Sequence, residues 1–506
     1  MLGLLFKDAS TATSASPNRA DIVCFVGYVA RRPAAVPTVV KTWLQNQGWR
    51  PLGTVVDDQD ALLHTPVPLD SFEAFDRLFA WDQRPAAANG FSHPTWLGAA
   101  VRSFFRQGGA RCFVVRTGDP WAPVYQADSA PADVTAAAEQ ARRERLRTLF
   151  PGFEGTARPS PQDSASWKGH GVILGLPEAA MLCFPDLPEI VSLATLDPVG
   201  LAPLPPTPEV FVECGPAAKV PAEATRQISP SPACTVADYG TWADAVRQVT
   251  DLLHSHRPDV ELVLSLPLPA RGAENETRQM PEKFSTAFLQ LAYPWLSTAG
   301  SEALPGGLEP PDGVLAGALA RCIPNLGVAR SIGMQPLRGV QGFFPALPGA
   351  DLRLDIIHTE EMSLLQRVSL LGPTPDGPAI LSDVTTSKDI AHRPAPIGRL
   401  TAAIIRTSRQ IGQTVAFEPS GEQLWQGIRS QLERLMADFH QAGALQGASQ
   451  AEAFSVRCDE TTTSQNDLDN GRVIAEVRFN PSHPIGLITV VLALRDGGLT
   501  SLVPSV

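Results

Sequence analysis

The sequence predicts a multidomain protein of mixed α/β and α+β class, and three observations support this prediction. Its 506 residues correspond to about two to four domains at roughly 100–200 residues each. Buried-strand and amphipathic-helix patterns alternate along the first part of the chain, which is typical of α/β domains. The last third contains one long amphipathic helix followed by strand patterns. Proline and glycine are frequent, at 47 and 40 residues, so we expect short elements and many loops.

The alternation begins near the N-terminus. Residues 21–30 form an apolar run that predicts a buried strand. Residues 72–79 and 95–106 have apolar side chains at helical spacing, and Gly108-Gly109 is a typical stop for the second helix. Residues 112–116 then predict a strand. This strand–helix–strand order favours an α/β domain.

The middle of the chain predicts further α/β elements between less regular segments. Residues 120–170 and 200–235 are rich in Ala, Pro and Arg or dense in proline, and we interpret them as insertions, with a helix near residues 134–149. Residues 172–184 predict two strands separated by a turn at Pro177. Residues 239–255 predict an amphipathic helix, and a buried strand at residues 260–266 follows it.

The C-terminal third contains the clearest helix. Residues 402–412 predict one helix, and residues 414–417 predict a strand closed by Glu418-Pro419. Ser420 is predicted to cap the next helix, with Gln423 in the reciprocal position of a capping box. One face of that helix is apolar, with residues Leu424, Ile428, Leu432, Leu435 and Phe439. Gly443 is predicted to end it.

Strands are predicted after this helix. They cover residues 454–458, Val473–Phe479 and the fully apolar run 487–494. A polar tail, residues 495–506, contains the turn-like Asp496-Gly497-Gly498 and a further apolar segment at residues 499–503. This tail either folds back over the edge of the sheet or extends an arm; the sequence leaves both open.

Composition excludes several classes of protein. A net charge of -11 and a pI of about 5.4 disfavour binding to a phosphate backbone. The seven cysteines are scattered without a C-x-x-C pair, so we expect buried free thiols rather than disulfides or zinc. No apolar run reaches the ~18–20 residues that span a bilayer, and the first residues lack a basic leader. We therefore expect assembly in the cytoplasm and no membrane insertion.

Motifs of catalysis or of cofactor binding are missing from the sequence. It has no phosphate loop, no G-x-G-x-x-G turn, no H-E-x-x-H and no G-x-S-x-G elbow. We interpret His254 and His256 as a solvated helix end, and the aspartates at residues 57–60 as an acidic loop rather than a calcium site. Residues 459–463 are either a connecting loop or a paired-carboxylate site, and we favour the loop. We predict no enzyme, no cofactor and no metal.

The C-terminal region resembles the contractile tail sheath family. Residues 415–419 with Leu424-Trp425, residues 454–462 and residues 469–477 follow the order and spacing of that family's motifs. The residues that carry the match are Phe417, Glu418, Pro419, Trp425, Cys458, Asp459, Glu460, Thr462, Asp469 and Gly471. Weaker matches occur at residues 19–27, 66–79, 97–116, 293–295, 310–317 and 336–340, so the resemblance covers most of the chain and is looser across the two insertions.

The resemblance implies a mechanical role. Sheath subunits stack as rings around an inner tube and contract to drive that tube through a target envelope. The implied organisation is an N-terminal arm at residues 1–20, a subtilisin-like α/β middle region at residues 21–385, a C-terminal core sheath domain at residues 386–494 and an extension at residues 495–506. The implied partners are other copies of the chain, the inner tube, baseplate and terminator proteins and other sheath paralogues, without nucleic acid. The chain would then belong to a phage virion or a phage-tail-like injection particle.

Two groups of residues are predicted to make contacts in such an assembly. Terminal arms that add strands to a neighbour's sheet would use Leu2, Leu4, Leu5, Phe6, Ile485, Leu487, Ile488, Val490, Leu492 and Leu494. A tube-facing helix surface would use Glu422, Arg429, Glu433, Arg434 and Asp438, for which a merely solvated face is an equal alternative. The N-terminal arm is shorter than is usual in the family.

Two other functions remain open at this point. A divergent chain of this kind could be a minor ring, a baseplate-proximal subunit or a terminator or adaptor that does not form the main polymer. A subtilisin-like hydrolase is less favoured, because the G-T-S-M-A motif of the serine proteases is absent.

Overall fold

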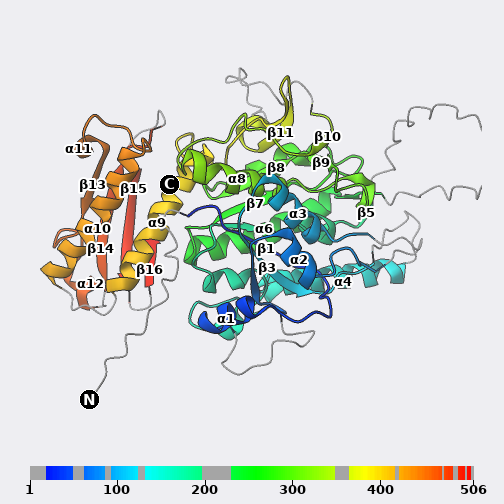
Figure 1. The fold of residues 1–506 in the computed structure, drawn as a ribbon, viewed down its shortest axis with the longest axis horizontal. Coiled ribbons are helices and arrows are strands. Elements are labelled where there is room, and N and C mark those ends of the chain that lie inside the picture. The colour runs from blue at the N-terminus through cyan, green and yellow to red at the C-terminus, as the bar shows by residue number, and fades with distance from the viewer. Residues whose placement is uncertain are drawn as a thin grey trace, which may run out of the picture.

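The computed structural model describes residues 19–49, 62–85, 93–122, 132–195, 230–347, 364–415, 421–469, 472–482, 488–495 and 498–502. They form a large α/β domain, here residues 19–394, and a smaller layered domain, here residues 395–502 (Figure 1). The first helix of the small domain, α9 (Ala395–Val415), connects it to the large domain. The predictions that concern Leu2, Leu4, Leu5, Phe6 and the aspartates at 57–60 lie outside the described residues.

A mixed sheet forms the centre of the large domain. Its order, among the described residues, is β12 (Gly377–Ile380), β11 (Ser369–Thr374), β8 (Leu289–Tyr293), β7 (Glu261–Ser265), β4 (Met181–Cys183), β1 (Val23–Tyr28), β3 (Cys112–Gly118) and β2 (Pro66–Leu69). The strands from β11 to β3 are parallel, and β12 and β2 are antiparallel edge strands. The parallel strands are the expected result of the strand–helix alternation in the sequence.

Helices cover both faces of this sheet. Successive residues of β1 point to opposite faces, so Val23 and Phe25 pack into one apolar core while Cys24 and Val26 pack into the other. The first core lies under α3 (Trp96–Gln107) and α8 (Asp312–Leu326), and the second lies under α6 (Val236–His256) and the 3-10 helix η3 (Gly169–Gly175). Both faces of the strand are therefore apolar, as a parallel sheet requires.

The remaining elements of the large domain are short apart from α4. They are α1 (Thr38–Asn46), α2 (Phe72–Leu78), α4 (Ala132–Leu149), α5 (Leu187–Val191), α7 (Glu276–Gln279), the pairs β5 (Ala194–Thr195) with β6 (Pro232–Ala233) and β9 (Trp295–Thr298) with β10 (Val340–Phe344), and 3-10 turns at Phe153–Gly155, Ser164–Ser166, Met280–Lys283, Pro305–Gly307 and Leu364–Gln366.

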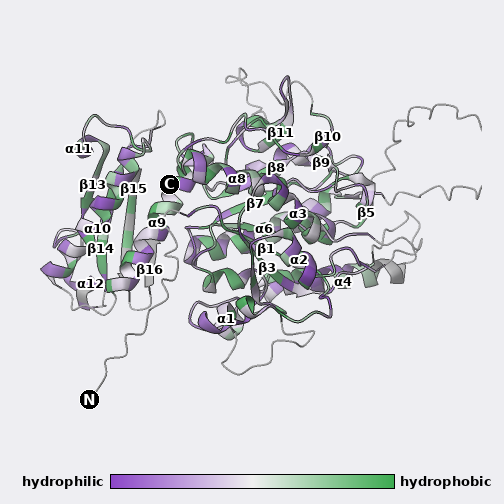
Figure 2. Cartoon of the chain, viewed as in Figure 1, coloured by the Kyte–Doolittle hydropathy of each residue, from purple (hydrophilic) through white to green (hydrophobic). Residues whose placement is uncertain are grey.

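The small domain is a sheet with helices on one face. Its strand order is β13 (Phe454–Arg457), β14 (Val473–Phe479), β15 (Ile488–Arg495) and β16 (Gly498–Leu502), and all neighbours are antiparallel. Helix α10 (Glu422–Gln441) packs on it, while α11 (Gln450–Ala453) and α12 (Gln465–Asp469) are short connections. The first apolar core of the large domain continues along α9 into this domain. Figure 2 shows the strands as hydrophobic and much of the helices' outer surface as hydrophilic.

Several predicted elements are confirmed. The side chain of Thr95 caps α3, and Gly108 ends it with a left-handed φ of 106°. The apolar face predicted for α10 is buried at every predicted position, and Gly443 follows its end with a φ of 71°. The sequence leaves two alternatives open for the tail, and the structure has the fold-back: β16 pairs with β15 from Arg495↔Gly498 to Val491↔Leu502.

Three predictions are wrong. Residues 169–175 form a 3-10 helix instead of the first strand of the pair predicted within 172–184. Thr414 and Val415 end α9 instead of beginning a strand, and the rest of that prediction, with Phe417, Glu418 and Pro419, lies outside the described residues. The residue before α10 is Gly421, which makes no side-chain cap, so the predicted capping box is not formed.

Candidate functional site

The carboxyl ends of the parallel strands are the usual place for a ligand in an α/β fold. The chain adds β3 on one side of β1 and then β4 on the other, so the strand order reverses between β1 and β4. In open α/β sheets, ligands bind in the crevice at this switch point, often at a helix N-terminus. A catalytic site, if the fold had one, would therefore be expected at this place.

The carboxylate of Asp186 occupies this switch point. Its Oδ2 accepts a hydrogen bond of 2.7 Å from the N–H of Tyr28 at the end of β1, and its Oδ1 accepts one of 3.2 Å from the N–H of Leu97 in the first turn of α3. Burial raises the pKa of Asp186 to about 7. A Cβ on Gly27 would lie 2.2 Å from Asp186 Oδ2, so only glycine allows this approach. The chain thus fills with its own side chain the position where a ligand would bind.

Two further acids are buried near the same edge. Ser103 donates a hydrogen bond of 2.7 Å to Glu309 Oε1, and Ser265 Oγ accepts one of 3.2 Å from the N–H of Asp312 at the start of α8. Burial raises the pKa of Glu309 and of Asp312 to about 7. These groups are fully buried, and the serines pair with acids rather than with a histidine. They do not form the nucleophile and base of a hydrolase.

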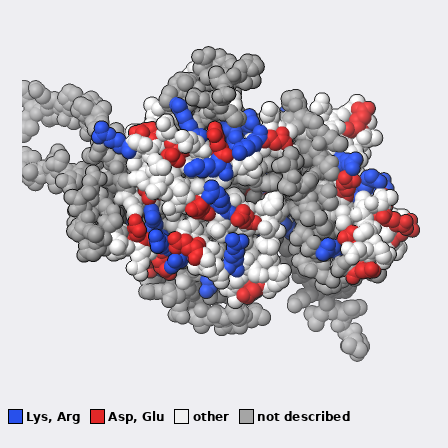
Figure 3. Space-filling view, turned by 180° about the vertical axis from the view of Figure 1, so that it is seen from behind, with Lys and Arg blue, Asp and Glu red and all other residues white. Residues whose placement is uncertain are grey.

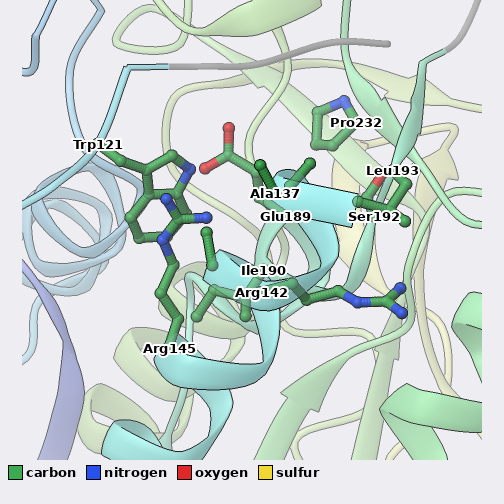
Figure 4. Close-up of a pocket in the computed structure, with 11 residues that line it drawn as sticks. Trp121, Ala137, Arg142, Arg145, Glu189, Ile190, Ser192, Leu193 and Pro232 are labelled. Carbon is green, nitrogen blue, oxygen red and sulfur yellow. The ribbon is translucent and has the colours of Figure 1, made fainter. Parts of the chain in front are cut away.

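A cavity of about 340 Å³ lies between α4, α5 and the start of β6 (Figure 4). Its wall is mainly apolar, and its charged residues are Arg142, Arg145 and Glu189. Arg142 pairs with Asp238 at 2.8 Å, and the guanidinium of Arg145 lies 4.0 Å from the centre of the Trp121 ring.

The remaining charge of this cavity is also held inside the protein. Glu189 pairs with the buried Arg84 at 2.9 Å. Burial lowers the pKa of Arg145, which remains a cation stacked on an aromatic ring. The charges of the cavity therefore fix α4 to α6 and to the loop of Trp121, and α5 to the loop of Arg84.

The described residues offer neither a metal cluster nor a membrane-spanning helix. They contain no group of three or more His, Cys, Asp or Glu side chains placed to hold a metal ion. No helix among them is both long and apolar enough to cross a bilayer. His254 and His256 lie in the last turn of α6, at the helix end that the sequence predicts.

The motif residues after β13 form a connecting loop. The carboxylate of Asp459 accepts hydrogen bonds from the N–H and hydroxyl of Thr461, and the hydroxyl of Thr462 donates to the carbonyl of Ile474 at 2.8 Å. Glu460 is exposed, and Cys458 is buried beneath the loop. These contacts tie β13 to β14 and confirm the interpretation as a loop. Trp425 packs partly buried on the core, Asp469 ends α12, and Gly471 lies outside the described residues.

The polar face of α10 is exposed to solvent. Arg429 and Glu433 pair at 2.8 Å, with side chains 51% and 42% exposed. Arg434 donates to the carbonyl of Ser430, Glu422 accepts from Gln426, and Asp438 lines a shallow groove at the end of α8. This face is available for a contact, and its orientation toward a tube stays a prediction.

The apolar C-terminal run lies inside the chain's own sheet. Ile488, Val490, Leu492 and Leu494 belong to β15, which pairs with β14 on one side and β16 on the other. The side chains of Val490 and Leu492 are buried. Ile485 and Leu487 lie outside the described residues. In this single chain β13 and β16 are the edges of the sheet, and an exchange of strands between subunits stays a prediction.

A buried ionic network, not predicted from the sequence, fixes α9 to the large domain. Asp259 pairs with Arg257 at 3.0 Å, with Arg409 at 2.5 Å and with Arg406 at 3.6 Å. Burial opposes the ionisation of Asp259, but these arginines hold its pKa well below its usual value. The available signal was the spacing of Arg399, Arg406 and Arg409, which places arginines on the otherwise apolar face of a helix.

Comparisons with known proteins relate this fold to contractile machines. No protein-family model matches the chain, and no curated protein sequence does. Among solved structures, a chain of the anti-feeding prophage baseplate (6-fold symmetrised) is 16% identical with a TM-score of 0.55, and 95% of each chain is covered. A chain of the anti-feeding prophage helical sheath in the contracted state is 16% identical with a TM-score of 0.54 over 96% of each chain.

A third match comes from a different system. It is a chain of the contracted PVC sheath complex of an extracellular contractile injection system, 15% identical with a TM-score of 0.51, over 92% of this chain and 89% of that one. These likenesses extend over both domains and nearly the full length of each protein. The chain has the fold of the sheath proteins of contractile injection systems.

Proposed function

We propose that this chain is a structural subunit of a contractile sheath, which assembles as stacked rings around an inner tube and contracts to drive the tube outward. The observation that carries the proposal is the match to contracted sheath assemblies over 92% or more of the chain, including the small domain. A fold shared only in the α/β domain would carry much less weight, because α/β folds serve many functions.

The interior of the large domain supports a non-enzymatic role. Asp186 fills the switch point of the sheet, and the charges of the cavity near Trp121 are paired or stacked internally. The strand order, with β1 internal and later strands added on both sides, supports the further proposal that the large domain has a subtilisin-like topology used as scaffold.

The buried network around Asp259 supports movement of the subunit as one body. Contraction of such a machine is a change between two packings of subunits, so each subunit must keep its shape while its contacts change. Helix α9 is continuous, lies in the apolar core of both domains and is held by Asp259 and Asp383. This construction joins the two domains through a single rigid element.

The test is electron microscopy of the purified chain, alone and co-expressed with the inner tube protein from its own gene cluster. We expect rings or tubes in at least one condition, with cooperative unfolding as the control that the preparation is folded. A folded chain that stays monomeric in both conditions contradicts the proposal.

A second candidate function is a baseplate-proximal subunit that forms one ring rather than the main polymer. The match to a chain of the anti-feeding prophage baseplate favours it, together with a baseplate in the contracted state at a TM-score of 0.53. Single rings that never stack, with or without the tube, support this candidate, whereas long tubes exclude it.

A further inference from the structure

Four arginines gather on the surface made by α3, α8 and the segment before β10. Arg102 and Arg106 lie four residues apart on α3, Arg321 lies on α8, and Arg338 precedes β10. A Cβ built on Gly108 would lie 3.2 Å from Arg338 Nη1 and 3.3 Å from Arg321 Cδ. These four residues are called the arginine patch below.

Arg106 lies equally close to the segment that carries Arg338. A Cβ built on Gly339, the neighbour of Arg338, would lie 2.5 Å from Arg106 Nε. Arg106 and Arg338 are exposed, and Arg102 and Arg321 are half-buried. Arg106, Arg321 and Arg338 therefore lie side by side on one surface, and Arg102 lies one turn before Arg106 on α3, with its guanidinium 5.0 Å from the centre of the Trp81 ring.

No carboxylate pairs with the arginine patch within the part of the chain that the structure describes. Arg102 donates to the carbonyl of Gly300, and Arg321 donates to the carbonyl of Pro336 at 2.8 Å. In the same described part, the side chains of Arg106 and Arg338 make no ion pair and no hydrogen bond. Glu309 interacts electrostatically with Arg102, but it is buried and bound to Ser103.

The patch differs from the surfaces of α4 and α6. On α4 and α6, exposed arginines have carboxylate partners: Arg147 pairs with Glu154 at 2.9 Å, and Arg247 pairs with Asp244 at 2.5 Å. On the face shown in Figure 3, basic and acidic side chains are interspersed over the large domain. Burial, together with the neighbouring Arg106, lowers the pKa of Arg102, as expected where like charges lie close together.

Like charges gathered on one surface are unfavourable unless a complementary surface meets them. The chain has a net charge of -11, so its copies repel one another unless local contacts bring opposite charges together. A second copy of the chain has carboxylates that could meet the patch. Glu422, Glu460 and Asp469 of the small domain are exposed and make no ion pair in the described structure. Arginine presents a fork of donors that fits a carboxylate with two hydrogen bonds.

We propose that the arginine patch is a docking surface for carboxylates on a second copy of this chain. This inference rests on the proposed function, since it identifies one contact of the polymer. A nucleic acid offers similar anions, but the overall negative charge of the protein opposes its approach. The contact is electrostatic, so its strength falls as salt rises.

The experiment compares two double variants that change the net charge equally. R106E/R338E reverses the two exposed members of the patch, neither of which makes a side-chain hydrogen bond or ion pair in the described structure. R143E/R247E is the control, because it reverses two exposed arginines on α4 and α6, where each has a carboxylate partner. Equal urea unfolding midpoints of the two variants establish that both are folded.

Assembly is measured as the fraction of protein that sediments, at increasing concentration and in several salt concentrations, with electron microscopy of the pellets. We expect the patch variant to need about tenfold more protein to assemble than the wild type and to lose most of its salt dependence. The control should assemble like the wild type, apart from a small effect of its added negative charge.

Three outcomes overturn the proposal, and they differ in what else they affect. Wild-type assembly that R106E/R338E leaves unchanged removes the patch as a contact and leaves the proposed function standing. A folded wild type that does not assemble, either alone or with the inner tube protein, removes both. Binding of a fluorescent DNA duplex at low salt by the wild type, lost in the patch variant but kept in the control, would assign the patch to nucleic acid instead.

Discussion

Arg399 and Asp383 form a bidentate ion pair inside the protein, with Nη1–Oδ1 at 2.9 Å and Nη2–Oδ2 at 2.7 Å. Their side chains are 2% and 0% exposed. Asp383 also accepts hydrogen bonds from the N–H of Ile332 and the side chain of Gln290. Because Arg399 lies in the first turns of α9 and Asp383 follows β12, this pair fastens the helix that leads to the small domain onto the large sheet.

Replacement of one partner leaves the other charge buried without a counterion. We expect Asp383→Asn to lower the free energy of unfolding by about 3–5 kcal/mol, as measured by urea unfolding near neutral pH. The control is Glu433→Gln, which breaks the exposed pair with Arg429 on α10 and should cost no more than about 0.5 kcal/mol. Equal costs for the two variants would show that the buried pair is not what holds α9.

The same pair has a defined dependence on pH. Burial opposes the ionisation of Asp383, but Arg399 holds the pKa of this carboxyl below its usual value of 3.8. The stability that this shift contributes is present above that usual value and is lost as the pH falls below it. The difference between wild type and Asp383→Asn should therefore shrink in strong acid.

Gly27 allows Asp186 to fill the switch point, so we expect Gly27→Ala to destabilise the protein. The new Cβ would lie 2.2 Å from Asp186 Oδ2, and relief of this clash would displace the hydrogen bonds to Tyr28 and Leu97. The expected loss is roughly 1–3 kcal/mol in the free energy of unfolding. In an Asp186→Ala background the same substitution should cost clearly less, because the clashing carboxylate is gone.

A glycine in an open position supplies the control for this prediction. Gly240 lies inside α6, and a Cβ there meets nothing within 4 Å. Gly240→Ala should therefore stabilise the helix by up to about 1 kcal/mol. If Gly27→Ala also stabilises the protein, the close approach of Asp186 is not a constraint of the fold.

Burial of Glu309 predicts a loss of stability as pH rises toward neutrality. Its pKa is raised to about 7, so between 4.5 and about 7 the folded protein keeps a proton that the unfolded chain releases. Stability falls with rising pH across this window and levels off above it. Glu309→Gln keeps an oxygen for the Ser103 hydroxyl but cannot titrate.

Urea unfolding from about pH 5 to pH 8 measures this effect. Glu309→Gln should reduce the slope of stability against pH by up to about 1.4 kcal/mol per unit, and the rest should remain because Asp186, Glu261 and Asp312 are raised similarly. Glu433→Gln, on the exposed face of α10, should leave the slope unchanged. A slope unaffected by Glu309→Gln would mean that this carboxyl is ionised in the folded protein.

Local signals predicted the elements whose causes are local. Thr95 and Gly108 bracket α3 as the capping rules require, and the alternation of β14 buries Val473, Ala475, Val477 and Phe479 on one face. The wrong prediction at residues 172–184 has a distant cause. The guanidinium of Arg257 binds the carbonyls of Ile173, Leu176 and Ala179, which stabilises a 3-10 turn where the apolar pattern alone indicates a strand.

In the candidate site, too, contacts between residues close in sequence could be predicted and contacts between distant residues could not. The loop after β13 could be predicted, because Asp459 and Thr462 bind groups close in sequence. Asp186 could not be found, since its partners Tyr28 and Leu97 lie 158 and 89 residues away. The arginine patch also depends on contacts between distant parts of the chain: α3 packs against α8, which carries Arg321, and the side chain of Gln107 on α3 bonds to the backbone of Arg338.

The fold-back of the tail changes how the C-terminal region is best tested. Removal of residues 484–506 would delete β15, an internal strand of the small domain, and would unfold the sheet rather than remove an arm.

Removal of residues 497–506 takes away β16 alone and leaves the backbone of β15 unpaired along one side. We expect amide hydrogen exchange to become faster in residues 488–495, while Val473–Phe479 stay protected because β14 keeps both neighbours. A free edge also predicts association of the shortened protein that increases with concentration.

The matched control removes residues 503–506, which follow β16, and should leave the exchange of β15 as in the wild type. Unchanged protection of residues 488–495 after the longer truncation would mean that β16 does not cover this edge in solution. In that case β16 would instead be expected to act as an arm that pairs with a neighbouring subunit.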